Sequence, residues 1–248
     1  GLMKQICLLL VLLACSASAT PSPHRELFDL IDARLELMAE VAAFKWQNRL
    51  AIEDLDRETA VLDEAAEDAL RVSIDPISSR AFFREQIEAA KDIQQFWFRR
   101  FETGESITSV RDLQREIRPE LLHLGDAITR KMSESGAVTE VFEAIFNGSV
   151  QVEGLSATRR QALFTSLTGV QHFPDRFTQI RRTGRLRVGT TGDYAPFSAR
   201  DDRGLTGIDI TMAHDLAAAL GVDLVLVDTS WPSLIADLDA GLWDIGMS

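Results

Sequence analysis

The sequence predicts an all-α helical domain followed by the start of an α/β domain. Its 248 residues are 46% hydrophobic and 26% charged, a balance typical of globular proteins. No glycine occurs between Gly1 and Gly104. Eight of the fifteen glycines lie in the last 65 residues, namely Gly184, Gly189, Gly192, Gly204, Gly207, Gly221, Gly241 and Gly246. We infer two architectures, helical before this change and strand-containing after it.

The helical part shows apolar residues at three- or four-residue spacing, as one buried helix face requires. The first such face consists of Leu27, Ile31, Leu35, Met38 and Ala42. Further helices are expected over about 56–72, 76–101 and 108–133, with shorter ones over about 138–147 and 156–167. Asp75-Pro76 supplies an N-cap followed by proline at the first helical position, so the start of the 76–101 helix is the best supported.

The last part alternates short apolar runs with helical patterns. Strands are expected over 186–190, 222–227 and 244–247, and helices over 208–220 and 231–240. This βαβα order implies a parallel sheet with helices on its faces. Pro174 and the pair Arg181-Arg182 interrupt the pattern between the two parts. The expected organisation is therefore a helical domain over 20–178, a linker over 179–184 and a partial α/β domain over 185–248.

The first residues have the features of an export signal. Lys4 precedes an apolar run from Ile6 to Ala14, and the small residues Ala17-Ser18-Ala19 follow it. Residues 1–19 are thus expected to be a cleavable signal peptide, which predicts a periplasmic or secreted protein. Leu12-Leu13-Ala14-Cys15 also resembles a lipobox, which leaves a lipid anchor at Cys15 as an alternative. A buried N-terminal helix is the other alternative. The start at Gly1 and the stop after a strand-like segment are typical of a fragment.

Charge and composition exclude several classes of protein. The formal net charge of −12 argues against nucleic acid as a partner, because phosphate favours positive surfaces. Cys7 and Cys15 both lie in the first apolar run, so a disulfide framework and a cysteine-ligated zinc site are not expected. The four histidines show no metal-ligand spacing. We therefore expect no metal and no cofactor.

Arg34 and Lys45 are a candidate anion site. Their spacing places them about 20° apart around a helix axis and roughly 16 Å apart along it. Two cations reaching toward each other from one apolar face can bind a small molecule with two carboxylates. The alternative is that each is a surface charge whose stem lies beside the core.

Several motifs near these cations resemble one family. They are Arg34, Ala42-Ala43-Phe44-Lys45-Trp46, Ile52-Glu53-Asp54 with Arg57, Ile74-Asp75-Pro76 and Phe83-x-x-Gln86-Ile87-x-Ala89. In order and interval they resemble the all-helical chorismate mutases of the secreted gamma subclass, over about Pro23 to Phe177. The resemblance implies an enzyme that rearranges chorismate to prephenate without a cofactor, in a homodimer whose active sites each lie within one chain.

The resemblance also implies roles for six residues. Arg34 and Arg57 match arginines that hold substrate carboxylates, and Lys45 matches a lysine at a carboxylate and the ether oxygen. Asp54 matches an acid that accepts a hydrogen bond from a substrate hydroxyl. Gln94 matches the residue at the ether oxygen, and Arg118, in Ile117-Arg118-Pro119, matches a further arginine.

One position departs from the family's pattern, and two sets of residues have simpler explanations. Ala90 stands where the family often has serine or threonine, so a hydroxyl contact is missing. Asp54 and Asp56 can be helix N-caps with Arg57 as a surface ion-pair partner. Gln94 can be a solvated residue. As a neutral amide it needs no protonation to donate to an ether oxygen, which predicts a broad pH optimum.

The α/β part resembles a second family. Leu186 to Phe197 and Gly207-Ile208-Asp209-Ile210 are similar to the first lobe of periplasmic solute-binding proteins of the amino-acid type (type II). Thr190 to Tyr194 and Thr229 to Leu234 are most similar to cyclohexadienyl dehydratases, which act on prephenate or arogenate. The resemblance implies Thr191, Asp193, Tyr194 and Trp231 as candidate site residues. With only part of a two-lobed domain present, we expect no dehydratase activity from this stretch alone.

Two other functions stay open at this level. The first is a non-catalytic periplasmic receptor that binds an aromatic or amino-acid-like ligand. It needs the cations but has no particular need of Gln94. The second is a helical stalk for a nutrient-binding lipoprotein, which requires lipidation of Cys15. The favoured hypothesis remains a bifunctional protein of phenylalanine biosynthesis, in which prephenate from the first part is the substrate of the second.

Overall fold

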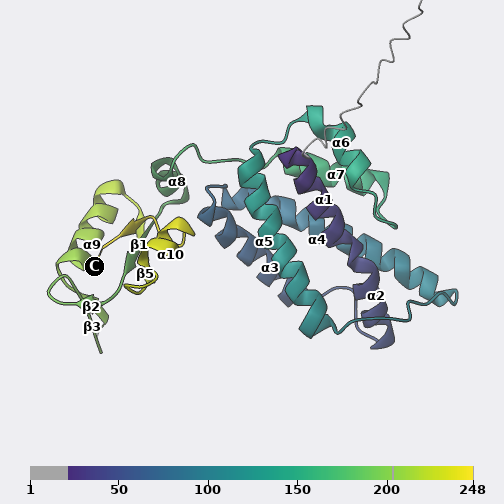
Figure 1. Cartoon of the computed structure of the whole chain (residues 1–248), viewed down its shortest axis with the longest axis horizontal. Coiled ribbons are helices and arrows are strands. Elements are labelled where there is room, and N and C mark those ends of the chain that lie inside the picture. Colours follow the sequence, from purple (N-terminus) through teal and green to yellow (C-terminus); the bar gives the residue numbers. More distant parts are fainter. Residues whose placement is uncertain (1–21, 203, 248) are drawn as a thin grey trace, which may run out of the picture.

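A computed structural model describes residues 22–202 and 204–247 as a helical domain and a smaller α/β domain (Figure 1). The expected signal peptide, with Cys7 and Cys15, lies outside these residues. Within the described ranges, no helix is both long and apolar enough to cross a membrane.

Five helices build most of the helical domain: α1 (Pro23–Glu36), α2 (Met38–Gln47), α3 (Leu55–Arg71), α4 (Pro76–Glu102) and α5 (Arg118–Ser135). A π-helical turn, η1 (Leu113–Ile117), leads into α5. The 3₁₀ turn η2 (Glu140–Phe142), α6 (Glu143–Ser149) and α7 (Ala157–Thr168) follow. α1 packs on α5, and α4 packs on α2, α3 and α7. One large apolar core results, as the spacing of apolar residues predicts, and Ala42, Ala43 and Phe101 form a second, smaller cluster.

The first apolar face is divided between two helices. α1 ends before Leu37 and α2 begins after it, but Leu37 keeps a right-handed backbone (φ −60°, ψ −16°). The two helices therefore continue in similar directions. Leu27, Ile31 and Leu35 in α1 and Met38 in α2 are all buried. The predicted apolar face therefore continues across the break between the two helices.

Helix ends follow their capping residues. Asp75 caps α4 by accepting from the backbone N–H of Ser78 at 2.8 Å, which confirms the predicted start. The start expected at about Thr108 is wrong. Helical structure begins only at Leu113, because the Asp112 carboxylate accepts from the N–H groups of Gln114 at 2.9 Å and Arg115 at 2.7 Å. An aspartate that binds two of the free N–H groups fixes the first turn at this point.

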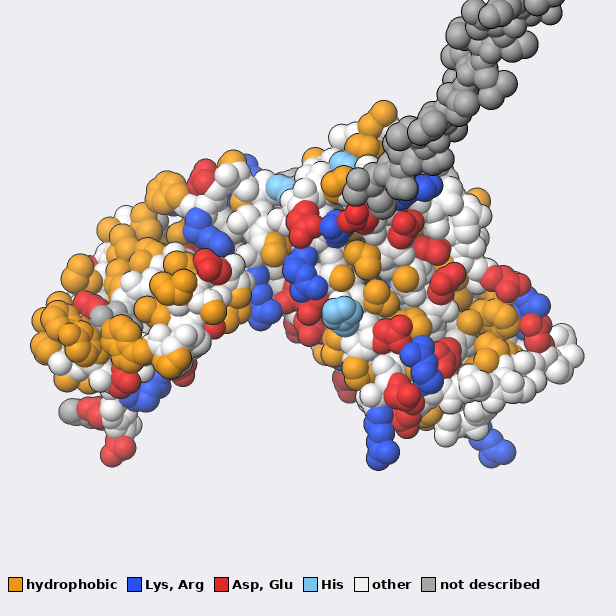
Figure 2. Space-filling view, viewed as in Figure 1, with side chains coloured by type: hydrophobic (Ala, Val, Ile, Leu, Met, Phe, Trp, Pro, Cys, Tyr) orange, Lys and Arg blue, Asp and Glu red, His pale blue; other side chains and the backbone are white. Residues whose placement is uncertain are grey.

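The α/β domain contains the expected parallel sheet. β1 (Arg185–Thr190) lies between β5 (Asp223–Asp228) and β6 (Ile245–Gly246), and both pairings are parallel. The helices α9 (Ile208–Leu220) and α10 (Leu234–Asp239) connect these strands. The segment expected as a loop forms a small antiparallel sheet of β2 (Asp193–Tyr194), β3 (Ser198–Asp201) and β4 (Gly204–Thr206). Hydrophobic side chains gather on the visible face of this domain (Figure 2).

The segment between the domains is helical. Residues 179–184, which the sequence pattern assigns to a linker, form the second half of α8 (Arg176–Thr183) and the left-handed Gly184 that ends it. Gln179 Nε2 donates to the Leu70 carbonyl at 2.9 Å, and Arg176 Nη1 donates to the same oxygen at 3.2 Å. α8 therefore binds the C-terminal end of α3, where helix carbonyls lack partners within the helix.

Candidate active site

A cavity of about 130 Å³ lies among helices α1 to α5. Its wall includes all six residues that the sequence pattern singles out in this domain: Arg34, Lys45, Asp54, Arg57, Gln94 and Arg118. They come from five elements far apart in the sequence. Arg34 and Lys45 lie in the last turns of α1 and α2, Asp54 and Arg57 begin α3, Gln94 lies in α4, and Arg118 begins α5.

Arg34 and Lys45 are buried cations. Their exposed fractions are 7% and 8%, so neither is the surface charge that was the alternative. Burial and, to a smaller extent, the positive charge of Arg57 together lower the pKa of Arg34 to about 10. Burial also lowers the pKa of Lys45, against the opposing effect of Asp54. Among the residues that the structure describes, neither side chain forms an ion pair. The site therefore attracts an anion.

Asp54 is the N-cap that the simpler explanation predicts, and it also pairs with an arginine of the cavity wall. Its carboxylate caps α3 by accepting from the Arg57 N–H at 3.1 Å, and its other oxygen pairs with Arg118 Nη2 at 3.1 Å. Arg118 also donates to Gln114 Oε1 at 2.7 Å. The Arg57 side chain faces the same cavity, and within residues 22–202 and 204–247 it has no ion-pair partner. Its guanidinium is thus available to a ligand.

Gln94 is buried rather than solvated, with 5% of its surface exposed. Its Nε2 donates to the Ala90 carbonyl at 3.1 Å and approaches Met38 Sδ at 3.7 Å. Its Oε1 is buried without a partner among the described residues. An amide that donates to an ether oxygen must turn its Nε2 away from Ala90, so this structure shows Gln94 at the cavity but not in the donating orientation.

The cavity also has an acidic side that the sequence interpretation missed. Glu64, Asp68 and Asp126 contribute to its wall. Burial and a hydrogen bond with Asp126 raise the pKa of Asp68 to about 7, while Arg71 opposes this effect. Part of this acidic side could have been predicted from the sequence, because Glu64 and Asp68 follow Arg57 at helical spacing on α3. Asp126 comes from α5, and only the packing of the two helices brings it there.

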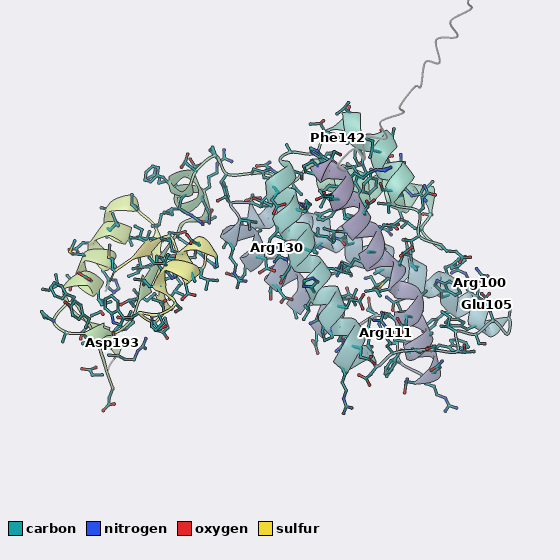
Figure 3. All side chains as sticks on the ribbon, viewed as in Figure 1. Arg100, Glu105, Arg111, Arg130, Phe142 and Asp193 are labelled. Carbon is teal, nitrogen blue, oxygen red and sulfur yellow. The ribbon has the colours of Figure 1, made fainter. Side chains whose placement is uncertain are left out.

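The candidate site residues of the α/β domain lie at the end of that domain that faces away from the helical domain. Figure 3 shows Asp193 at this end. Trp231 Nε1 donates to Asp193 Oδ1 at 3.1 Å. The Tyr194 ring contacts the Trp231 ring edge-on, with the centroids 5.6 Å apart. Thr191 lies in the turn between β1 and β2, next to this cluster in sequence.

The helical-domain cavity can bind a small dianion. Five cationic side chains border it, and two of them, Arg34 and Lys45, are buried and lack a carboxylate partner in the described part of the chain. Such preorganised charge both holds carboxylates and stabilises negative charge that develops during a reaction. No group of three or more histidine, cysteine, aspartate or glutamate residues in the described ranges is arranged to hold a metal ion.

Two family models match the chain. Chorismate mutase type II matches residues 24–95, and bacterial extracellular solute-binding proteins, family 3, matches residues 186–248. The monofunctional chorismate mutase of Enterobacter agglomerans is 29% identical over 146 residues, which cover 57% of this chain and 80% of the relative. The crystal structure of a secreted chorismate mutase from Yersinia pestis shares the helical fold, with a TM-score of 0.56, 24% identity and coverage of 60% of this chain and 98% of that one.

The C-terminal part has a different relative. The cyclohexadienyl dehydratase of Pseudomonas aeruginosa is 50% identical over 74 residues, or 29% of this chain. The chain spans only 28% of the length of this relative. Fold and similarity agree on both parts, and the chain joins a helical domain similar to chorismate mutases to part of a domain similar to family 3 solute-binding proteins.

Proposed function

We propose that the helical domain converts chorismate to prephenate. The observation that carries this proposal is the pair of buried cations, Arg34 and Lys45, on a cavity that Arg57 and Arg118 also border. Chorismate carries two carboxylates, and this arrangement offers positive charge to both. The similarity to chorismate mutases supports the same substrate.

The reaction is an intramolecular Claisen rearrangement, in which the ether C–O bond breaks as a C–C bond forms. It needs no nucleophile. The protein must hold the folded conformer and stabilise the negative charge that develops on the ether oxygen. Arg34, Arg57 and Arg118 are suited to the first task. Of the three donors on Lys45 Nζ, one binds the Ile52 carbonyl at 2.6 Å, and the others can serve the ether oxygen together with Gln94.

The test is the loss of chorismate absorbance with the purified chain and with Arg34→Ala and Lys45→Ala variants. Each substitution removes charge-assisted hydrogen bonds from the transition state, so we expect kcat/KM to fall at least about a hundredfold. Arg25→Ala is a matched control, because Arg25 is exposed on the same helix as Arg34. A well-folded wild type that binds chorismate without turnover would favour the receptor function instead.

We further propose that the whole protein to which this chain belongs acts on prephenate or arogenate through its second domain. The support is the similarity to cyclohexadienyl dehydratase and the contact between Asp193 and Trp231. In the complete protein, Asp193→Asn should abolish formation of phenylpyruvate from prephenate and leave mutase activity intact. An amino-acid receptor is the alternative for this domain, because relatives include an L-cystine-binding protein of Escherichia coli, 38% identical over 79 residues.

Export and a homodimer complete the proposal. The pattern of residues 1–19 and the similarity to a secreted chorismate mutase support export. N-terminal sequencing of protein from the periplasmic fraction tests it, and cleavage after Ala19 is the expected result. Sedimentation of the purified protein tests the dimer. Labelling with a radioactive fatty acid distinguishes the lipid-anchored alternative at Cys15.

A further inference from the structure

A glutamine on α4 is fully enclosed in the helical core next to the cavity. Gln86 has no exposed surface, and its Oε1 accepts a hydrogen bond from Arg34 Nη1 at 3.3 Å. Its Nε2 is buried without a partner in the described residues. Burying an amide with unsatisfied capacity is unfavourable, so an apolar side chain would serve the core better. The position therefore calls for an explanation other than packing.

Arg34 differs in its partners from Arg111 and Arg159, two arginines of the same domain. Arg111 binds the carboxylates of Glu40 and Glu120, and Arg159 binds those of Asp92 and Glu85. Arg34 is more buried than either, yet its partners in the described structure are the neutral amide of Gln86 and the face of the Phe83 ring, 5.9 Å away. The most deeply buried of these guanidinium groups is thus the one that no carboxylate neutralises.

We propose that Gln86 is a positioning residue that orients Arg34 through a neutral acceptor, so that the positive charge stays available to a substrate carboxylate. This inference rests on the mutase function proposed above. Gln86 acts through Arg34 and not on the reacting atoms. A glutamate at this position would form a buried ion pair and compete with the substrate. An apolar residue would leave the guanidinium without a fixed direction.

The decisive variant is Gln86→Glu, which keeps the volume and the acceptor and adds only a charge. We expect KM for chorismate to rise about tenfold to a hundredfold, with a smaller change in kcat, because the substrate must displace a bound carboxylate. Gln95→Glu is the matched control, since Gln95 is the same residue type, exposed on the same helix. It should keep the wild-type KM.

The pH dependence separates this effect from a structural one. Lowering the pH from about 8 to about 4, just below the ordinary glutamate pKa of about 4.3, protonates part of the introduced carboxyl group and gives Arg34 a neutral partner in that fraction of the molecules. The KM of Gln86→Glu should then approach that of the wild type at the same pH, whereas Gln95→Glu should show no such recovery. Loss of packing alone would give a KM defect that does not recover at low pH.

If circular dichroism shows that Gln86→Glu does not fold, Gln86→Met tests the positioning role of Gln86 instead. It has similar volume but no acceptor, and we expect a rise in KM of about threefold to tenfold that does not depend on pH. Wild-type KM in either folded variant would overturn the inference and leave the mutase function standing. A wild type that neither binds nor converts chorismate would overturn both.

Discussion

Arg118 Nη2 donates to Asp54 Oδ2 at 3.1 Å and so joins the start of α5 to the start of α3, across 64 residues of chain. The other oxygen of the same carboxylate caps α3. One side chain therefore fixes both the helix that carries Arg57 and the direction of Arg118. The cap predicted for Asp54 is confirmed, and its contact with a substrate hydroxyl stays a prediction.

The two contacts of Asp54 can be separated by substitution. Asp54→Ala removes the cap and should lower the free energy of unfolding by about 1 kcal/mol, measured by urea denaturation. Asp54→Asn keeps a capping oxygen and should lose less. The ion pair is partly exposed and contributes little by itself. Equal losses in the two variants would show that the charge, and not the cap, stabilises the protein.

Lys45 should set an alkaline limit to activity. Because burial lowers its pKa, it loses its proton below the ordinary lysine value of 10.5, and kcat/KM should fall in that range. The unfolded chain then holds this proton more tightly than the folded one. The contribution of Lys45 to stability therefore rises as pH increases through the lowered pKa toward 10.5.

The pH profiles of two variants test this assignment. Lys45→Arg should move the alkaline limit upward in whatever activity it retains, since guanidinium keeps its proton. Lys131→Met is the control, because Lys131 pairs with Glu26 and Glu134 away from the cavity. An alkaline limit that stays in place in Lys45→Arg would assign it to another group, Arg34 being the first candidate.

Asp68 should give the pH profile a shallow slope. With a pKa of about 7, it ionises between pH 6 and 8 beside Asp126 and Glu64, and it adds negative charge to a cavity that binds a dianion. We expect kcat/KM to fall about threefold as pH rises through this range, and Asp68→Asn to remove the fall. The broad optimum inferred from Gln94 would then hold apart from this slope. A steep loss that persists in Asp68→Asn would contradict both expectations.

The same carboxyl group affects stability with a definite sign. Its pKa is raised in the folded state, so its favourable contribution is present below the ordinary value of 3.8 and is lost as pH rises to about 7. Thermal unfolding of the wild type should show this decrease, and Asp68→Asn should reduce it. The opposing ion pair with Arg71, at 3.0 Å, remains a weaker influence.

Ala90→Ser should restore a polar contact at the cavity. Ala90 lines the wall one turn before Gln94, and the unpartnered Gln94 Oε1 is a ready acceptor for an added hydroxyl group. We expect a rise in kcat/KM of about twofold to tenfold with unchanged stability. Ala89→Ser is the contrast, because Ala89 is buried in the core and should lose stability without gaining activity. Lower activity in Ala90→Ser would mean that the hydroxyl disturbs Gln94.

Gly241 tests how the two domains are joined. Its φ is +69°, and an added Cβ would lie 2.1 Å from the Arg71 carbonyl oxygen at the end of α3. Gly241→Ala should loosen this contact and speed proteolysis between residues 173 and 184. Gly221→Ala is the control, because φ is +68° there but no atom lies within 4 Å of the added Cβ. Equal sensitivity of both variants would indicate backbone strain alone, and mutase activity should be retained in both.

Signals along the chain predict the two architectures and six of the residues that border the cavity. Apolar spacing specifies which face of each helix is buried, and capping residues such as Asp75 fix where helices begin. Both signals are local, so the chain order reveals them. The resemblance of the motifs around Arg34, Lys45 and Gln94 to one family predicts that these residues share a site. Periodicity alone does not predict this, because it says nothing about which helices pack together.

The electrostatics of the site depend on how the helices pack. Gln86 meets Arg34 from 52 residues away, and Asp68 meets Asp126 where α3 packs on α5. Neither contact leaves a periodic signal in the sequence, because each depends on how two helices are placed against each other. Burial then sets the strength of these charges. The sequence specifies which groups are present, and the packing of the helices determines which of them are desolvated and which are neutralised.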